Sequence, residues 1–369
     1  MALGERLKHA RNSLKLTLND VESRTQIAVS TLSEFENNKR EPKLSQLKSL
    51  ADLFRRSISF FLEEGEVVPE TVLWRERPTT PRAEEMQAQL LALAEQYHHL
   101  EIWCEDRQEY QLPMDSSALE TYDFPNAETL ANRVRSSLGL GDRPGQTLLR
   151  VLEEVCKVKV FHFAFQPTGS AACTLSSNFG AAILLNANNV RWRRNFDLAH
   201  ELFHLLTWRI FRQTVSTETA EPTEKEESLA GCFASVLLMP QDAILSAVNT
   251  AKAGRAKLGF DDLFEVARQF DVSIEALLWR MKSIYRIPPD KVRGYIESFQ
   301  GQIGFWDDRE RDDPPNRPLR FHVLARHALR KGMISAGRYA EYLGISRREA
   351  MQVVEQDASD DAEVEVAYS

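Results

Sequence analysis

The residues with the clearest chemical potential lie in the stretch Asn195–Trp208, which contains the pentapeptide HELFH at positions 200–204. In a helix, His200 and His204 stand one turn apart on the same face and can hold one metal ion between them. Glu201 lies about 100° around the helix axis from His200, within reach of a water molecule beside that ion. The spacing therefore predicts a metal site with a general base. The alternative is an amphipathic helix whose two histidines are hydrogen-bonded core residues.

A candidate third ligand lies in a second helical run, Glu227–Met239. Glu227 shares one helix face with Ala230, Gly231 and Ala234, because these positions have i, i+3, i+4 and i+7 spacing. Three small residues let another helix approach closely, so the Glu227 carboxylate can reach the metal. Two histidines and one glutamate leave a coordination position for water, as catalytic zinc sites do. The alternative is an ordinary tight helix contact whose acidic N-terminus suits the helix dipole, and both can hold together.

The composition is that of a globular protein with room for several domains. The chain has 369 residues, of which 43% are hydrophobic and 27% charged, enough for two or three domains. Its four cysteines, Cys104, Cys156, Cys173 and Cys232, form no C-x-x-C pair, which favours a reducing cytoplasm. No run has the apolar length of a signal peptide core or a membrane span, so we expect no membrane contact. The net charge of −8 argues against nucleic-acid binding by the whole surface but allows one basic module.

Residues 1–64 have the pattern of a compact all-helical unit. Thr17 and Ser30 are placed to cap two short helices, and a further helix is predicted from Leu44 to Phe54. The expected core consists of apolar residues at helical spacing: Leu3, Leu7, Ala10, Val21, Leu32, Phe35, Leu44, Leu47, Leu50, Ala51, Phe54, Ile58, Phe60 and Phe61.

The ordered segments TLNDV at 17–21, STLS at 30–33 and NKREP at 38–42 resemble the XRE family of helix-turn-helix DNA-binding domains. The resemblance implies DNA-binding helices over Leu18–Arg24 and Ser30–Asn37, the second of which enters the major groove. It also implies a homodimer on paired half-sites of double-stranded operator DNA. By this resemblance the candidate DNA-binding residues are Ser30, Thr31, Ser33, Glu34 and Asn37 on the groove face, with Lys39, Arg40 and Lys43 near phosphates.

Four positions depart from the usual pattern of that family. Leu18 replaces a common glutamine, and Glu22 replaces a small helix-packing residue. Gln26 and Asn38 stand where glycine is usual, although asparagine tolerates the left-handed conformation. The alternative interpretation of residues 1–64 is a small helical domain that pairs only with protein.

A connector and a second folded unit follow this head. Residues 65–115 are expected to be a linker with an amphipathic helix over Arg82–Arg107, which could pair two protomers or pack on the next domain. Helices are predicted near residues 125–138 and 148–155, a strand over Val158–Phe165 and a hairpin over 173–186. His162 is predicted to be an ordinary histidine of a strand face and not a metal ligand.

The segments NFDLAHELFH at 195–204 and ExxAxxFAxxLLMP at 227–240, with ExLAxxVR at 128–135 and ILLN at 183–186, resemble the ImmA/IrrE family of metallopeptidase-like domains. The resemblance implies one zinc ion (Zn2+) per chain, held by His200, His204 and Glu227, with Glu201 as the catalytic general base. It also implies cleavage of a repressor or partner regulator under stress or during induction of a mobile element. Gly231 stands where asparagine is frequent in that family.

The C-terminal part is predicted to be helical. Gln241–Met281 has helical spacing, Gly304–Pro318 is expected to be a loop, and Arg320–Val354 forms a last helical unit. That unit has helix-turn-helix-like spacing, and packing against the peptidase domain is the preferred interpretation. Residues 357–369 are acidic and predicted to be disordered. The residues considered for the oxyanion partner of the peptidase are Tyr285, His322 and His327.

These patterns predict a mainly α protein with a small β-sheet, an α+β fold in five segments. They are a helix-turn-helix domain (1–64), a linker and amphipathic helix (65–115), a zincin-like metallopeptidase domain (116–280), a helical module (281–356) and an acidic tail (357–369). The preferred function is a cytoplasmic, nucleoid-associated transcription regulator that cleaves a repressor, a partner regulator or itself. One alternative is a non-catalytic sensor whose peptidase-like domain binds a ligand or partner protein. Another is a toxin–antitoxin or phage-defence component.

Overall fold

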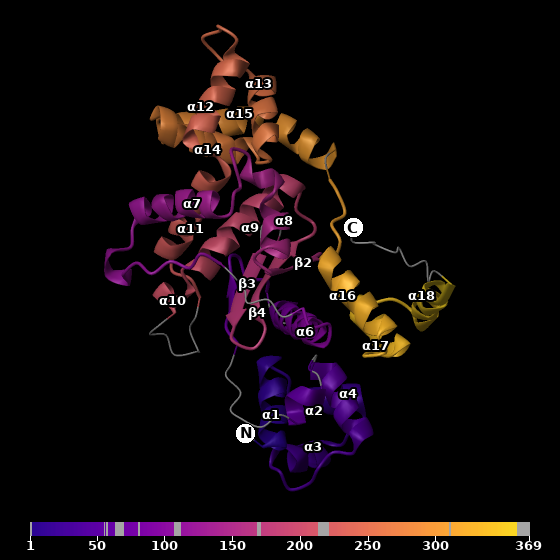
Figure 1. Cartoon of the computed structure of the whole chain (residues 1–369). Helices are drawn as coiled ribbons and strands as arrows, with labels where there is room; N and C mark the ends of the chain where they lie inside the picture. Colours follow the sequence, from indigo (N-terminus) through magenta and orange to yellow (C-terminus); the bar gives the residue numbers. More distant parts are fainter. Residues whose placement is uncertain are drawn as a thin grey trace.

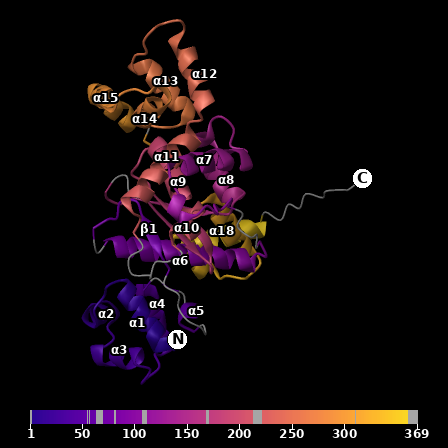
Figure 2. The same cartoon turned by 90° about the vertical axis from the view of Figure 1, so that its left-hand side faces the viewer.

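The computed structural model describes residues 2–54, 56, 58–62, 70–79, 82–106, 112–167, 171–212, 221–309 and 311–359. Its elements lie in three tiers (Figure 1). The first helices form a head at one end, a small sheet with helices on both faces forms the middle, and a group of later helices lies at the other end. The view turned by 90° gives the same order of tiers, with α6 between the head and the sheet (Figure 2). The predicted α+β class is therefore confirmed.

The head is a helical unit with its own core, as predicted for residues 1–64, except that Leu44 is 73% exposed and lies outside that core. Its helices are α1 (Leu3–Ser13), α2 (Leu18–Thr25), α3 (Val29–Glu36), α4 (Leu44–Phe54) and α5 (Ile58–Leu62). Thr17 caps α2, because its side chain accepts a hydrogen bond from Asp20 N. The prediction that Ser30 caps α3 is wrong: α3 begins at Val29, so Ser30 lies inside its first turn.

Three of the four departures from the usual head pattern have a structural explanation. Gln26 and Asn38 both adopt the left-handed conformation, with φ of 60° and 56°, so the backbone keeps the turns that glycine usually makes. The Glu22 carboxylate accepts a hydrogen bond from Val29 N at 3.2 Å, so it satisfies a free donor at the start of α3. Asn38 also accepts a bond from Gly4 N at 2.8 Å, which ties the end of α3 to α1.

The middle tier is built on a four-stranded sheet in the order β1-β3-β4-β2. The strands are β1 (Val72–Trp74), β2 (Lys159–Phe163), β3 (Ala171–Ser176) and β4 (Gly180–Asn186). The predicted hairpin is β3 paired antiparallel with β4, while β2 runs parallel to β4 and β1 antiparallel to β3. β1 comes from the stretch expected to be a connector, so that stretch supplies one edge of the sheet.

The two faces of the sheet are covered by different helices. One face packs against a core shared with α7 (Phe124–Ser137), α8 (Leu148–Glu154), α9 (Arg191–Leu206) and α11 (Glu224–Leu238). The opposite face packs against α6 (Arg82–Trp103) and the C-terminal helices α16 (Leu319–Arg330), α17 (Ala336–Leu343) and α18 (Arg347–Ser359). Side chains alternate between these two cores along the strands, as the period of two requires. The amphipathic helix of the connector therefore packs on the sheet.

Two expectations for the C-terminal part need correction. The stretch Gly304–Pro318 is not a loop from its first residue, because α15 (Pro289–Arg309) continues through residue 309. Helix α18 runs to Ser359, so 357–359 belong to a helix and not to a disordered tail, while 360–369 lie outside the described residues. The expected packing of the last helical unit on the middle tier is borne out by its shared core with the sheet.

The remaining described elements complete the middle and far tiers. They are η1 (Leu119–Thr121), η2 (Pro144–Gln146), α10 (Trp208–Phe211), α12 (Gln241–Lys252), α13 (Phe260–Phe270) and α14 (Ile274–Tyr285). The chain breaks between α13 and α14, where Asp271 is left-handed with φ of 56° and Ser273 caps α14. Among the described helices, none alone has the length and apolar character to cross a membrane, whereas α11 and α12, bent by 59°, pass that test as a pair.

Ion pairs join the head to α6. Lys15 Nζ lies 2.7 Å from the buried carboxylate of Glu84. Arg56 follows α4, its side chain is 7% exposed, and its Nη1 lies 2.5 Å from Glu95 Oε1. Arg56 also contacts Glu70 at 3.2 Å. The Lys15 side chain is 64% exposed, so the largely buried Arg56–Glu95 pair is the one that fixes where the head sits on α6.

Candidate metal centre

Helix α9 carries the H-E-x-x-H segment through the middle of the protein. It packs on β3 and β4, and apolar side chains such as Leu198, Leu202 and Leu205 are fully or nearly fully buried against them. Helix α11 packs on α9 through Ala230 and Ala234, both 0% exposed. Small residues at this contact let the two helices lie close, so side chains from one helix reach those of the other. Gly231, the third small residue expected at this contact, does not take part in a close approach, because a Cβ atom there would meet no atom within 4 Å.

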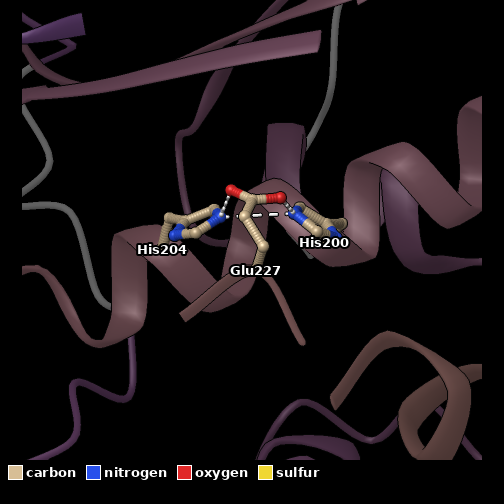
Figure 3. Close-up of side chains that lie close together, drawn as sticks. All are labelled: His200, His204 and Glu227. Atoms are coloured by element: carbon tan, nitrogen blue, oxygen red, sulfur yellow. Dashed lines mark hydrogen bonds and ion pairs between the residues drawn. The ribbon is translucent and has the colours of Figure 1, made fainter. Parts of the chain in front are cut away.

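The structure brings His200, His204 and Glu227 together. The two histidine Nε2 atoms are 3.3 Å apart. The carboxylate of Glu227 spans them, with Oε2 3.0 Å from His200 Nε2 and Oε1 3.3 Å from His204 Nε2. Figure 3 shows the carboxylate facing both imidazole edges. A potential ligand atom from each of the three residues lies within 4.8 Å of the other two.

These distances fit a tetrahedral metal ion. Zinc binds imidazole nitrogen and carboxylate oxygen at about 2.0–2.2 Å, so two of its ligands at a tetrahedral angle lie about 3.3 Å apart. The closest approaches at this site are 3.0 to 3.3 Å. Burial lowers the pKa of His200 to about 3, which keeps that imidazole neutral and able to ligate. Three residues leave a coordination position open.

Glu226 is a supporting residue that the sequence did not reveal. Its Oε1 lies 2.9 Å from His204 Nδ1 and 2.8 Å from Arg212 Nη2, and its side chain is 2% exposed. A bond from Nδ1–H to this carboxylate leaves Nε2 as the lone-pair nitrogen that faces Glu227. Burial opposes a charge on His204, but its bonds to Glu226 and Glu227 outweigh burial and raise its pKa to about 9. The carboxylates around His204 therefore favour a positive charge at this position, and a bound metal cation would supply that charge in place of a proton.

Glu201 has the environment of a general base. It is 0% exposed, and neither carboxylate oxygen has a hydrogen bond of normal geometry among the described residues. The Cys173 thiol of β3 is its neighbour. Burial raises the pKa of Glu201 to about 7, while His204 and Cys173 lower it. A carboxylate with two unsatisfied oxygens next to a metal site is ready to accept a water proton.

A buried charge network connects α9 to the sheet edge next to the ligands. Asp197 is 0% exposed and lies one turn before His200. Its carboxylate forms an ion pair with Arg75, which directly follows β1, and accepts a 3.0 Å bond from Asn189 Nδ2. Burial raises the pKa of Asp197 to about 6, against the opposing effect of Arg75 and Arg193. Arg75 also lowers the pKa of His200, so its charge acts at the site. No sequence motif signalled this contact.

The residues considered as oxyanion partners lie elsewhere. Tyr285 is the last residue of α14, and Lys252 Nζ lies 5.7 Å from its ring. His322 and His327 belong to α16, which packs on α6 and the opposite sheet face. His162, expected to be structural, has its Nδ1 3.2 Å from Pro315 O.

The candidate DNA-binding residues lie on one part of the head. Ser30, Thr31, Ser33 and Glu34 are on α3 and at least partly exposed. Asn37 follows α3, and its Nδ2 donates to Ser33 O at 2.7 Å. In both views α3 lies at the outer end of the head, away from α6 (Figures 1 and 2). The remaining three candidates, in the turn after α3, are all exposed: Lys39, Arg40 and Lys43.

Comparison with protein families gives two matches along the chain. The family described as the IrrE N-terminal-like domain matches residues 153–282, and the helix-turn-helix family matches residues 7–61. The chain thus joins a domain of the XRE helix-turn-helix family to a domain of the ImmA/IrrE family, and it is a regulator of the XRE/ImmA type. The matched segments contain α2 and α3 in one case and α9 and α11 in the other.

Other comparisons add little. No curated protein matches this chain. Among solved structures, the crystal structure of ComR from Streptococcus suis aligns over 98% of this chain and 97% of that chain, with 14% identity and a TM-score of 0.16. A similarity of that TM-score carries no argument about fold or function.

Proposed function

We propose that this chain is a transcription regulator whose head binds operator DNA and whose body is a zinc-dependent peptidase. The peptidase cleaves a repressor, a partner regulator or another copy of this chain in response to a stress or mobile-element signal. The observation that carries the enzymatic part is the meeting of His200, His204 and Glu227 next to the unsatisfied carboxylate of Glu201. A closed structural site would have a fourth protein ligand in place of the open position.

The residues have distinct roles in this proposal. Zinc held by two imidazoles and a carboxylate supplies Lewis acidity, which polarises a peptide carbonyl and eases ionisation of water. Glu201 accepts the proton of the attacking water and later returns it to the leaving amine. Glu226 orients His204, and Arg212 holds the Glu226 carboxylate. The Arg75–Asp197 pair fixes the helix turn before His200 against the sheet edge.

The peptidase proposal predicts a separation of metal binding from cleavage. Glu201→Gln keeps the three ligands and the side-chain shape, but the amide cannot accept the proton. We expect this variant to retain about one zinc ion per chain by elemental analysis and to lose cleavage of the neighbouring regulator by at least about 100-fold. Glu224→Gln, at an exposed position in the first turn of α11, is the control. Equal cleavage by wild type and Glu201→Gln would refute the enzyme and favour the non-catalytic sensor.

The DNA-binding proposal rests on the exposed face of α3 and the basic turn after it. A head of this type contacts one half-site, so we propose a homodimer on paired half-sites. We expect affinity for promoter DNA of its own gene, measured by fluorescence anisotropy, to fall steeply with salt. Arg40→Ala should weaken binding and reduce the slope of log K against log salt by about one. Arg293→Ala, in exposed α15 at the far end, should change neither. Salt-independent binding would contradict this assignment.

A further inference from the structure

A cavity lies where the head, α6 and the C-terminal helices meet. Its volume is about 540 Å³, and it is lined by residues of all three parts. The head contributes Lys48, Asp52 and Arg56, α6 contributes Glu95 and His99, and the C-terminal part contributes residues of α17 and its flanks. No residue of the candidate metal centre lines it. The cavity is thus a separate feature, at the junction through which the head is attached.

The lining is positively charged although the whole chain is acidic. Five basic side chains line the cavity, against three acidic ones. Two of the acidic groups already have basic partners, Glu95 with Arg56 at 2.5 Å and Glu341 with Arg338 at 3.3 Å. The lining thus carries an excess of positive charge in a chain whose net charge is −8.

Two arginines of the cavity have no acidic partner among the described residues. Arg317 precedes α16, and its Nε is buried without a hydrogen-bond partner. Burial lowers the pKa of Arg317, because removal from water disfavours the charged guanidinium. Arg347 begins α18, and a Cβ atom at Gly337 would lie 3.8 Å from its Nε. Arg347 therefore stands against the first turn of α17.

That first turn is itself an electropositive feature. Helix α17 has Ser335 as its cap and no acidic residue in its first turn, so its N-terminal partial charge is not offset there. Gly337 leaves this turn open, since a Cβ atom there would meet no atom closer than 3.8 Å. Below it, Tyr342 is 0% exposed, and its hydroxyl has no hydrogen bond of normal geometry although the Arg338 guanidinium lies over its ring at 5.0 Å. Arg338 is the neighbour that interacts with this hydroxyl, and a buried hydroxyl without a hydrogen bond of normal geometry is a group that a ligand can satisfy.

We propose that this cavity binds a small dianion, carrying a phosphate group or paired carboxylates, against Arg347 and the N-terminal turn of α17. Arg317, whose guanidinium would lie 3.7 Å from a Cβ atom at Gly344, adds positive charge from the other end of that helix. Guanidinium groups bind both kinds of anion through paired N–H donors, and a helix N-terminus adds backbone N–H groups. The bound anion neutralises the excess charge of the cavity. Lys48 and Arg56 of the head line the same cavity, so the bound anion also contacts the junction that attaches the head. An effect of the anion on operator affinity would follow from this, and that part rests on the proposed DNA-binding function.

The test is calorimetric titration of the full-length chain with inorganic phosphate and, separately, with succinate, at constant ionic strength. We expect saturable binding of at least one anion, and the arm that binds identifies the source chemistry. Arg317→Gln combined with Arg347→Gln should weaken binding at least tenfold. Arg293→Gln, an exposed arginine of α15, should leave binding unchanged.

Gly337→Glu is a second variant for which folding is not in question, because an acid in the first turn of a helix suits its dipole and the site has space. Its carboxylate should occupy the position of the anion, so that anion binding is lost while the melting temperature is kept or raised. Absence of saturable binding by the wild type overturns the proposal, as does equal binding by Gly337→Glu. If the wild-type chain does not bind operator DNA, the proposed function is wrong, but the result of the anion titration still stands.

Discussion

At the residue scale, the candidate metal centre includes a second carboxylate next to the expected ligand. Glu227 faces the two Nε2 atoms, and Glu226 faces the other nitrogen of His204. Adjacent residues on a helix point about 100° apart, so the two carboxylates reach opposite edges of the same imidazole. One pair of neighbouring glutamates can thus provide both a ligand and the group that orients a ligand.

We expect Glu226→Gln to lower zinc affinity by about 10- to 100-fold, because an orienting carboxylate fixes the tautomer and raises the basicity of the ligand it bonds. Competition with a fluorescent chelator measures the affinity. Glu224→Gln, two residues earlier and exposed, is the matched control and should bind zinc as the wild type does. If both variants bind equally tightly, the supporting role of Glu226 is wrong.

The sequence indicated the candidate ligands but not the residues that support them, for a physical reason. His200, Glu201 and His204 are fixed relative to one another by one helix, so their spacing alone predicts the geometry. Arg75 reaches Asp197 across 122 positions of sequence, and nothing in the local pattern of either residue announces that contact. Glu226 lies in the first turn of α11, where an acidic residue is expected because it interacts favourably with the helix dipole. Its position therefore gave no sign of a second role beside His204.

At the element scale, the outer edge of β2 is covered by the segment between α15 and α16. His162 N donates to Asn316 O at 3.2 Å, and His162 Nδ1 lies 3.2 Å from Pro315 O. This segment gives the strand backbone a partner on the side away from β4. His162 is 4% exposed, so a charge on its ring would be poorly solvated.

This burial predicts a stability loss in mild acid. Burial lowers the pKa of His162 to about 4, helped by Arg194 and opposed by Pro315 O and Asp312. The unfolded chain thus binds more protons, and the stabilisation is complete above about pH 6.5 and lost as the pH falls towards 4. His162→Gln keeps a hydrogen-bond donor that does not titrate. Between pH 7 and 4.5, the free energy of unfolding of this variant should therefore fall by on the order of 2 kcal/mol less than that of the wild type. Urea denaturation measures this.

The exposed His327→Gln is the control and should follow the wild-type pH dependence. Parallel curves for the wild type and His162→Gln would show that His162 does not titrate differently in the folded chain.

Elements with strong periodicity were predictable, and weakly patterned ones were not. The head helices, the hairpin and α9 have apolar spacing that gives their type directly. The stretch from Gly304 to Pro318 is polar and contains prolines, so it was expected to be a loop, yet α15 continues through its first residues. β1 has three residues and is defined by pairing with β3, so it has too little sequence to signal a strand.

At the scale of the whole molecule, the head is held on the body by charge rather than by a shared apolar core. The head core and the two body cores have no residues in common. Among the described residues, Lys15–Glu84 and Arg56–Glu95 are the closest charged contacts between head and α6. The Arg56–Glu95 pair is the one largely shielded from water, so the geometry of the junction depends mainly on it.

We expect Arg56→Met to lower the free energy of unfolding of the full chain by about 3 kcal/mol, because it leaves the partly buried carboxylates of Glu70 and Glu95 without their cation. Hydrogen exchange should also increase in α4 and at the facing side of α6. Arg24→Met, an exposed position on α2, is the control. Unchanged exchange at α4 and α6 would show that Arg56 does not hold the head.

The contribution of β1 and α6 to the sheet has a practical consequence for anyone who wishes to isolate the domain that matches the IrrE family. A fragment cut at residues 153–282 would begin after both elements and end before α16. It would leave β3 with a bare hydrogen-bonding edge and strip the apolar cover from one side of the strands, the two conditions that make a β-protein self-associate. The smallest self-sufficient body therefore starts before Val72 and retains the C-terminal helices.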